Sequence, residues 1–368
     1  MKKLCGLLAL LNLTGAAAEP RAQNVILFLG DAGGIPTLNA AGLYGHNQPL
    51  SLYLHQMPHI ALSETSSLDN WVTDSAAGMT AIVTGHKTNN GMLSLLPGTD
   101  GGADKPLKTI LEYAEERGLS TGVITNRPVW DATPAACWAH VNSRKSVGEI
   151  FQALLKPEQG DGVDIVIGAD KQGVVASARE LNLDAEQALR DAHYEVLATP
   201  EALTAETTRA AAIYDGDDFE PAPVVANAVK ALARNPRGFF LMVEWDMHPK
   251  PVEKGLKRAL VMDAMIRKIA EEAPPGTLII FAADHSFDLR LCGGNRVAPF
   301  ADQLAAAAAT PATLVPVSPA VLRVGEGHAG EEILVAAQGP GSERLHGFIP
   351  NTEIFRVMMS AYGWTETR

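Results

Sequence analysis

Short apolar runs alternate with amphipathic stretches along most of the chain. The apolar runs read as strands buried on both faces, at residues 25–29, 121–125, 163–167, 239–243 and 277–282. The stretches that favour helices are residues 107–117, 147–155, 185–192, 224–234 and 256–273. This alternation predicts an α/β fold with three layers, in which helices cover both faces of a central, mostly parallel sheet.

Acidic residues stand where three of the predicted strands end. Asp31, Glu244 and Asp284 each follow an apolar run closely. Parallel strands end at one edge of their sheet, and ligands collect at the carboxyl ends of such strands. We therefore expect these three carboxylates on a single rim.

The chain shows no internal repeat, and we expect one catalytic domain over residues 19–368. Residues 156–222 are mixed and acidic, which predicts an inserted cap segment between core elements. A second insert is expected near residues 295–325, because residues 301–320 are rich in alanine and proline and favour a loop or helix beside the site.

Residues 1–18 have the three parts of a secretory signal peptide. Lys2 and Lys3 precede a short apolar stretch at residues 4–13, and an Ala-x-Ala site precedes Glu19. The pattern predicts export, to the periplasm or the medium, over the alternative of a buried N-terminal helix. No later apolar run reaches the roughly 20 residues that a membrane-spanning helix needs.

Composition narrows the class of protein. The chain is 46% hydrophobic and 20% charged, as globular proteins are. Its net charge of −12 disfavours a nucleic-acid-binding surface. After the signal peptide only Cys137 and Cys292 remain, either as one disulfide or as two unpaired thiols.

One serine stands at the start of a segment of small residues. Asp74 and Ser75 precede Ala76, Ala77 and Gly78. The N-terminus of a helix presents unpaired N–H groups and suits an oxyanion or a phosphate. Small neighbours would let an ion or a substrate approach Ser75, although the same pattern is also an ordinary N-cap.

The order of the polar segments resembles that of the alkaline phosphatase family. The matching segments are residues 24–31, 74–77, 131–136, 140–145, 243–248, 283–286 and 325–330. The most specific are Asp-Ser-Ala-Ala at 74–77, Asp-Ala-Thr-Pro-Ala-Ala at 131–136 and Ser-Arg-Lys at 143–145. The resemblance implies hydrolysis of phosphate monoesters through a phosphoserine at Ser75, with two zinc ions and one magnesium ion as cofactors.

The resemblance also assigns the first metal ligands. It places Asp31, Ser75, Asp284 and His285 around the zinc that activates the serine. Two metal ions about 4 Å apart can activate the nucleophile and stabilise the leaving oxygen of a phosphate ester.

The second zinc would be bound by Asp246, His248 and His328, the last in a loop between glycines. Glu244, Asp246 and His248 follow one another at intervals of two, so they project to one face of an extended segment. The family usually spaces these residues more widely, and this chain departs from that pattern. We read Asp263 as part of helix structure.

The expected magnesium ligands supply oxygen only, as a hard octahedral ion prefers. The resemblance assigns them to Asp131, Thr133 and Glu244, with Asp31 bridging to the zinc pair. Asp131 could also form an Asx-turn before Pro134, which is compatible with the role of a ligand.

Arg144 is the expected phosphate clamp, because a guanidinium can hold two oxygens at once. Asp74 would orient it by a salt bridge, while the alternative is a solvated helix arginine. The expected ligands are phosphate monoesters and inorganic phosphate, and the family makes a homodimer possible.

Two rival functions remain. One is a phosphodiesterase or sulfatase on the same metal core, although the sulfatase pattern Cys/Ser-x-Pro-x-Arg is absent at Ser75. The other is a phosphate- or metal-binding protein that has lost turnover, which the intact set of ligands and nucleophile argues against.

Overall fold

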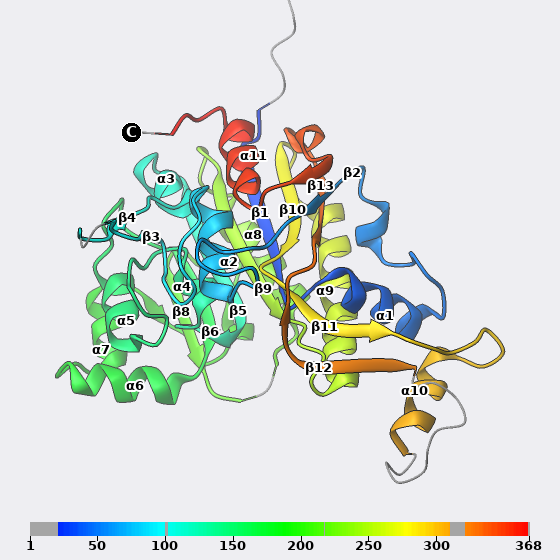
Figure 1. Ribbon diagram of the computed structural model, residues 1–368. Coiled ribbons are helices and arrows are strands. Elements are labelled where there is room, and N and C mark those ends of the chain that lie inside the picture. Colours follow the sequence, from blue (N-terminus) through cyan, green and yellow to red (C-terminus); the bar gives the residue numbers. More distant parts are fainter. Residues whose placement is uncertain (1–20, 100–101, 217, 310–320, 367–368) are drawn as a thin grey trace, which may run out of the picture.

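The computed structural model describes residues 21–99, 102–216, 218–309 and 321–366, so the expected signal peptide lies outside the described residues. A ten-stranded sheet forms the centre of this part (Figure 1). Its strands, in spatial order, are β14 (Gly347–Ile349), β2 (His59–Ser63), β13 (Ile333–Gln338), β10 (Thr277–Ala283), β1 (Asn24–Asp31), β9 (Phe239–Asp246), β5 (Ser120–Pro128), β6 (Ile165–Ala169), β8 (Ala210–Tyr214) and β7 (Glu195–Val196).

The sheet is mostly parallel. The strands β10, β1, β9, β5, β6, β8 and β7 run parallel to their neighbours, whereas β13 pairs antiparallel with both β10 and β2. The five strands predicted from the sequence correspond to β1, β5, β6, β9 and β10. The predicted fold class is confirmed, and the sequence pattern did not show the antiparallel strand β13 or the two strands beyond it, β2 and β14, which pair parallel with each other.

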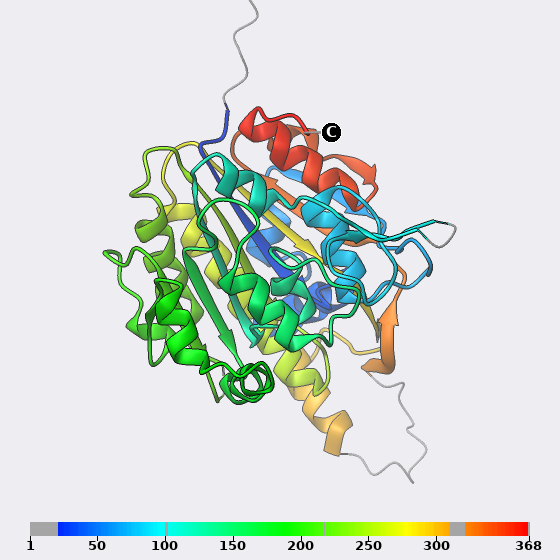
Figure 2. The ribbon, with the colours of Figure 1, turned by 90° about the vertical axis from the view of Figure 1, so that its left-hand side faces the viewer.

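Helices cover both faces of the sheet (Figure 2). Alternate residues of β1 point to opposite sides: Val25 and Leu27 belong to one hydrophobic core, and Ile26 and Phe28 to the other. The helices of the first side are α2 (Ser75–Thr84), α3 (Ile110–Glu116), α4 (Ala132–Ala135), α5 (Val147–Leu155), α6 (Lys171–Glu180), α7 (Ala185–Asp191) and α11 (Thr352–Tyr362). Those of the second side are α1 (Ile35–His46), α8 (Pro221–Leu232) and α9 (Val252–Glu272).

Residues 156–222 are part of the core and not an inserted cap, so that expectation is wrong. They supply β6, β8 and β7, which extend the main sheet by parallel pairing. The strands are short, and the helices α6 and α7 between them expose one polar face. The many polar residues of these helices dominate the composition of residues 156–222. The two apolar strands β6 and β8, of five residues each, therefore do not stand out in it.

The second expected insert does lie outside the main sheet. β11 (Ser286–Leu291) and β12 (Leu322–Ala329) form an antiparallel pair of their own, and α10 (Phe300–Ala309) follows β11. Figures 1 and 2 show α10 projecting away from the body of the molecule. Residues 310–320 of this insert are outside the described residues. The pair β3 (Leu95–Leu96) and β4 (Lys105–Pro106) completes the described strands.

Both remaining cysteines are free thiols, Cys137 buried and Cys292 partly exposed. This decides between the two alternatives that the sequence left open. Among the described residues, no helix combines the length and apolar character needed to cross a membrane.

Helix α2 packs so closely on the end of β10 that only glycine fits at the contact. A Cβ at Gly78 would lie 2.5 Å from the carbonyl oxygen of Asp284. The small residues after Ser75 therefore let the helix approach the sheet, in addition to leaving room around the serine.

We predict that Gly78→Ala destabilises the protein by about 1–3 kcal/mol, because the methyl group must displace backbone in a packed interior. Chemical denaturation would measure the loss. Gly148→Ala is the matched control, since its Cβ would meet only the flexible side chain of Leu181, at 3.2 Å. Equal stabilities of the two variants would contradict the close packing of α2 on Asp284.

Candidate metal centre

Three carboxylates meet where neighbouring parallel strands end. Asp31 is the last residue of β1, Asp246 is the last residue of β9, and Asp284 directly follows β10. In the sheet register Asp31 lies opposite Asp246, one residue beyond the pair Gly30 and Ala283. All three carboxylates are buried. Asp31 and Asp284 lie on the rim as expected, but Glu244 does not end its strand: β9 continues to Asp246, and Glu244 lies two residues earlier, opposite Leu29 of β1.

The first cluster surrounds the candidate nucleophile. Ser75 Oγ lies 3.1 Å from Nε2 of His285. That nitrogen is 3.4 Å from an oxygen of Asp31 and 3.4 Å from an oxygen of Asp284. The ligand atoms of the two aspartates and the histidine lie within 4.8 Å of one another, close enough to share one metal ion.

The buried atoms of this cluster fit a cation. Oδ1 of Asp31 and Oδ2 of Asp284 are buried without a hydrogen-bond partner, which is costly for carboxylate oxygens. Burial, and then repulsion from Asp284, raises the pKa of Asp31 to about 6. Burial lowers the pKa of His285 to about 3, so its ring is neutral and able to bind a metal.

A second cluster shares Asp31 with the first. Asp31, Asp246 and His248 bring ligand atoms within 4.8 Å of one another, and so do His248, His285 and His328. Nδ1 of His248 is 2.8 Å from Asp246 and 3.4 Å from Asp31. The spacing of two between Asp246 and His248 therefore does bring both side chains to one place.

His328 lies on strand β12 and not in a loop, so that expectation is wrong. The antiparallel pairing sets it opposite Phe287 of β11. Its ring stacks on that of His285 at 3.5 Å between centroids. The Thr73 carbonyl oxygen lies 2.9 Å from its Nδ1 and can accept that N–H, which leaves Nε2 free for a metal.

Asp74 connects the helix that carries Ser75 to Arg144. One of its oxygens accepts the N–H of Ala77 and caps helix α2. The other accepts the N–H of Gly91 and bonds Nη1 of Arg144 at 3.1 Å. The expected salt bridge between Asp74 and Arg144 is present, and Arg144 lies in a turn between elements instead of on a solvated helix.

The residues expected to hold magnesium have other partners. Asp131 bonds two arginines, with Arg127 at 2.9 and 3.0 Å and Arg144 at 2.7 Å. Glu244 accepts a hydrogen bond from the Thr125 hydroxyl. Thr133 is buried in the short helix α4. Neither Asp131 nor Glu244 joins a candidate cluster of metal-ligand histidines and carboxylates among the described residues.

Two arginines at the site were missed in the sequence. Arg127 lies near the end of β5, two residues beyond the strand predicted at 121–125. Since strand ends were expected to carry the rim carboxylates, its position was a signal that this arginine pairs with them. Arg258 projects from α9 and bonds both Asp246 and Asp218. Nothing in the local sequence around Arg258 signals that role.

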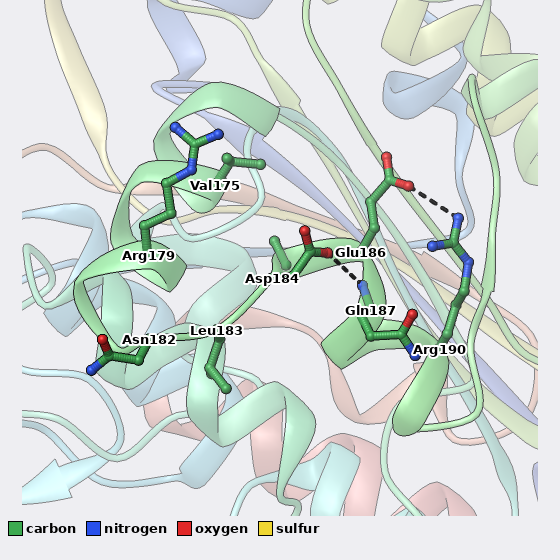
Figure 3. Close-up of a pocket in the computed structure, with 9 residues that line it drawn as sticks. Val175, Arg179, Asn182, Leu183, Asp184, Glu186, Gln187 and Arg190 are labelled. Atoms are coloured by element: carbon green, nitrogen blue, oxygen red, sulfur yellow. Dashed lines mark hydrogen bonds and ion pairs between the residues drawn. The ribbon is translucent and has the colours of Figure 1, made fainter.

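Other polar features lie away from this centre. A cavity of about 720 Å³ lies at α6 and α7, where Glu186 and Arg190 pair at 3.0 Å (Figure 3). A cluster of Glu112, His140 and Glu158 also has metal-ligand spacing. In this cluster Glu112 forms a capping box with Thr109 at the start of α3, and one of its oxygens lies 2.9 Å from Nε2 of His140. Helix capping therefore accounts for the position of Glu112.

Comparisons with known proteins identify the family of this chain. A sequence profile for alkaline phosphatase matches residues 22–170 and 201–317. Alkaline phosphatase 4 of Bacillus subtilis (strain 168) is 26% identical, over 91% of this chain and 88% of its own length. The alkaline phosphatase of Escherichia fergusonii is 28% identical, over 95% and 88%.

Solved structures share the fold. The alkaline phosphatase of Thermus thermophilus superposes with a TM-score of 0.75 at 21% identity, covering 98% of this chain and 96% of that one. The enzyme of the Antarctic bacterium TAB5 gives 0.74 at 21% identity, over 95% and 100%. Since the profile spans well over half of the chain, the protein belongs to the alkaline phosphatase family, as a metal-binding hydrolase of phosphate monoesters.

Proposed function

We propose that this enzyme hydrolyses phosphate monoesters through a phosphoserine on Ser75, at a centre that holds two zinc ions. The main support is the position of Ser75 Oγ, which lies 3.1 Å from His285 Nε2. The same cluster holds buried oxygens of Asp31 and Asp284 that have no hydrogen-bond partner. The mixture of imidazole and carboxylate ligands suits zinc.

In the first step, Ser75 Oγ loses its proton and bonds to phosphorus, the bond between phosphorus and the ester oxygen breaks, and that oxygen takes up a proton and leaves as the alcohol. In the second step, water displaces the serine and inorganic phosphate leaves. When bound, two metal ions supply Lewis-acid stabilisation and lower the pKa of coordinated oxygen. Asp31, Asp284 and His285, whose ligand atoms lie together, would hold the ion nearer Ser75. The family resemblance assigns the other ion to Asp246, His248 and His328, and His248 has ligand spacing with Asp246 in one cluster and with His328 in another.

Arg144 binds the phosphoryl group in this proposal. A guanidinium has five N–H donors. One goes to Asp74 and one to Asp131, which fixes the plane of the group and leaves three donors for oxygens of the substrate. A second ester group would compete with this contact, which favours monoesters over diesters.

Export and a homodimer remain proposals as well. The N-terminal pattern of residues 1–18 supports export, and the family resemblance supports the dimer. Cell fractionation and the mass of the purified protein in solution would test them.

The overall proposal is tested with p-nitrophenyl phosphate against bis-p-nitrophenyl phosphate, with chelator and after addition of zinc. We expect monoester hydrolysis that chelator abolishes and zinc restores. Faster hydrolysis of the diester would support the phosphodiesterase alternative instead. Zinc binding without turnover of either ester would indicate a binding protein.

Ser75→Ala should abolish the phosphoenzyme and most of the turnover, while zinc content and stability stay near those of the wild type. The reason is that the hydroxyl supplies the attacking oxygen, whereas the buried carboxylates and imidazoles hold the metal. Acid-quench labelling and metal analysis would show this. Ser51→Ala, at a surface hydrogen bond to Gln48, is the control. Turnover close to wild type in Ser75→Ala would exclude Ser75 as nucleophile.

Arg144→Ala should weaken inhibition by inorganic phosphate about ten- to a hundredfold, because a charged hydrogen-bond pair contributes about 1.5–3 kcal/mol. Zinc stoichiometry should be unchanged. Arg179→Ala removes an exposed arginine of α6 and serves as the control. An unaltered inhibition constant in Arg144→Ala would rule out the clamp.

His248→Ala and Asp246→Ala should each lower bound zinc at one site of the two. Activity should fall steeply and return in part at high zinc, because mass action can fill a weakened site. Zinc titration of the apoprotein measures this, with exposed His346→Ala as control. If both variants kept full zinc and activity, the second site would have to be built from other residues.

A further inference from the structure

The guanidinium of Arg127 lies among the carboxylates at which a third cation is expected. Its Nε and Nη2 lie 3.0 and 2.9 Å from Oδ2 of Asp131. Its Nε is 3.9 Å from Asp31, and its Nη1 is 3.8 Å from Asp246. One side chain of β5 therefore faces acids from β1, from β9 and from the start of α4.

The backbone of Arg127 is tied to the remaining expected ligand. Its N–H donates to the Thr125 hydroxyl at 2.8 Å, and that hydroxyl donates to Glu244 at 2.5 Å. The segment that carries the guanidinium thus also occupies an oxygen of Glu244. Arg127 and Glu244 are held in a fixed relation by Thr125.

Asp131 has no acceptor capacity left for a metal ion or its water. A carboxylate offers about four lone-pair sites. Oδ1 accepts from Nη2 of Arg144 at 2.7 Å and from the N–H of Ala132 at 2.8 Å. Oδ2 accepts from Nε and Nη2 of Arg127. Four donors therefore fill the four sites.

The charge at this position is permanent. A guanidinium does not lose its proton in proteins, and Arg127 lies within 4 Å of carboxylate oxygens of Asp31, Asp131 and Asp246. A fixed positive charge repels a divalent ion that would bind to the same oxygens. Asp131, whose four acceptor sites are filled, therefore does not fit a magnesium ion, and one oxygen of Glu244 is occupied by the Thr125 hydroxyl.

We propose that Arg127 replaces the third cation, so that this enzyme holds two metal ions and functions without magnesium. The inference rests on the proposed two-zinc function and deepens it. Arg127 acts as a positioning residue: it fixes Asp131, and through Asp131 it fixes the plane of Arg144. It also offsets the negative charge of Asp31, which both metal clusters share.

The first test uses the wild-type protein. The apoprotein is loaded with zinc in the presence and absence of magnesium, and bound metals are counted after desalting. We expect two zinc ions and no magnesium per chain, and a rate of monoester hydrolysis that magnesium does not change. One bound magnesium per chain, with a higher rate, would overturn the inference and leave the phosphoserine proposal intact.

The second test removes the guanidinium. Arg127→Ala frees oxygens of Asp131 and removes the repulsion, so this variant should bind magnesium and gain thermal stability when magnesium is added. Arg127→Lys keeps the charge and should show no such gain. Arg190→Ala deletes an exposed arginine of α7 and controls for the lost charge.

The outcomes separate the two claims. If Arg127→Ala neither binds magnesium nor responds to it in thermal stability, Arg127 does not stand in for a cation. If the wild type binds two zinc ions but hydrolyses no monoester, the proposed function fails, and the metal counts still decide the role of Arg127.

Discussion

The structure depends on one electrostatic constraint, the crowding of buried carboxylates at the ends of adjacent parallel strands. Asp31, Asp246 and Asp284 reach the same rim because β9, β1 and β10 are neighbours in register. Two unit charges about 5 Å apart repel by about 3 kcal/mol at an effective dielectric constant of about 20. One oxygen of Asp31 and one of Asp284 have no hydrogen-bond partner, so hydrogen bonds do not offset all of this repulsion. Cations must offset the rest.

The protein divides that task between metal sites and arginines. Toward Ser75 the carboxylates face imidazoles, which are ligands for exchangeable ions. Toward β5 and α9 they face Arg127 and Arg258, which cannot exchange. Asp131 lies between Arg127 and Arg144, so the arginine proposed to bind phosphate is held by a carboxylate that also pairs with Arg127. In that proposal, charge balance and substrate binding are linked through one carboxylate.

Two elements outside the sheet complete the site. Helix α2 brings Ser75 to the rim, and Gly78 allows it to pack on the backbone of Asp284. The pair β11 and β12 returns the chain to the metal centre, so that His328 stacks on His285 although 43 positions separate them in the numbering. Helix α2 thus places Ser75, and strand β12 places His328, next to His285, which follows the end of β10.

The sequence by itself determined the parallel core, two of the rim acids (Asp31 and Asp284) and the helix start at Ser75, because buried strands, strand ends and helix starts each leave local patterns. It also specified that Asp246 and His248 share a face, through their spacing of two. Only the tertiary structure decided that residues 156–222 extend the sheet, that His328 lies on a strand, and that Arg127 and Arg258 pair with the rim. Those features arise from contacts between distant segments. The order of strands in the sheet, the antiparallel pairing of β11 with β12 and the reach of long arginine side chains leave no periodic signal in the sequence.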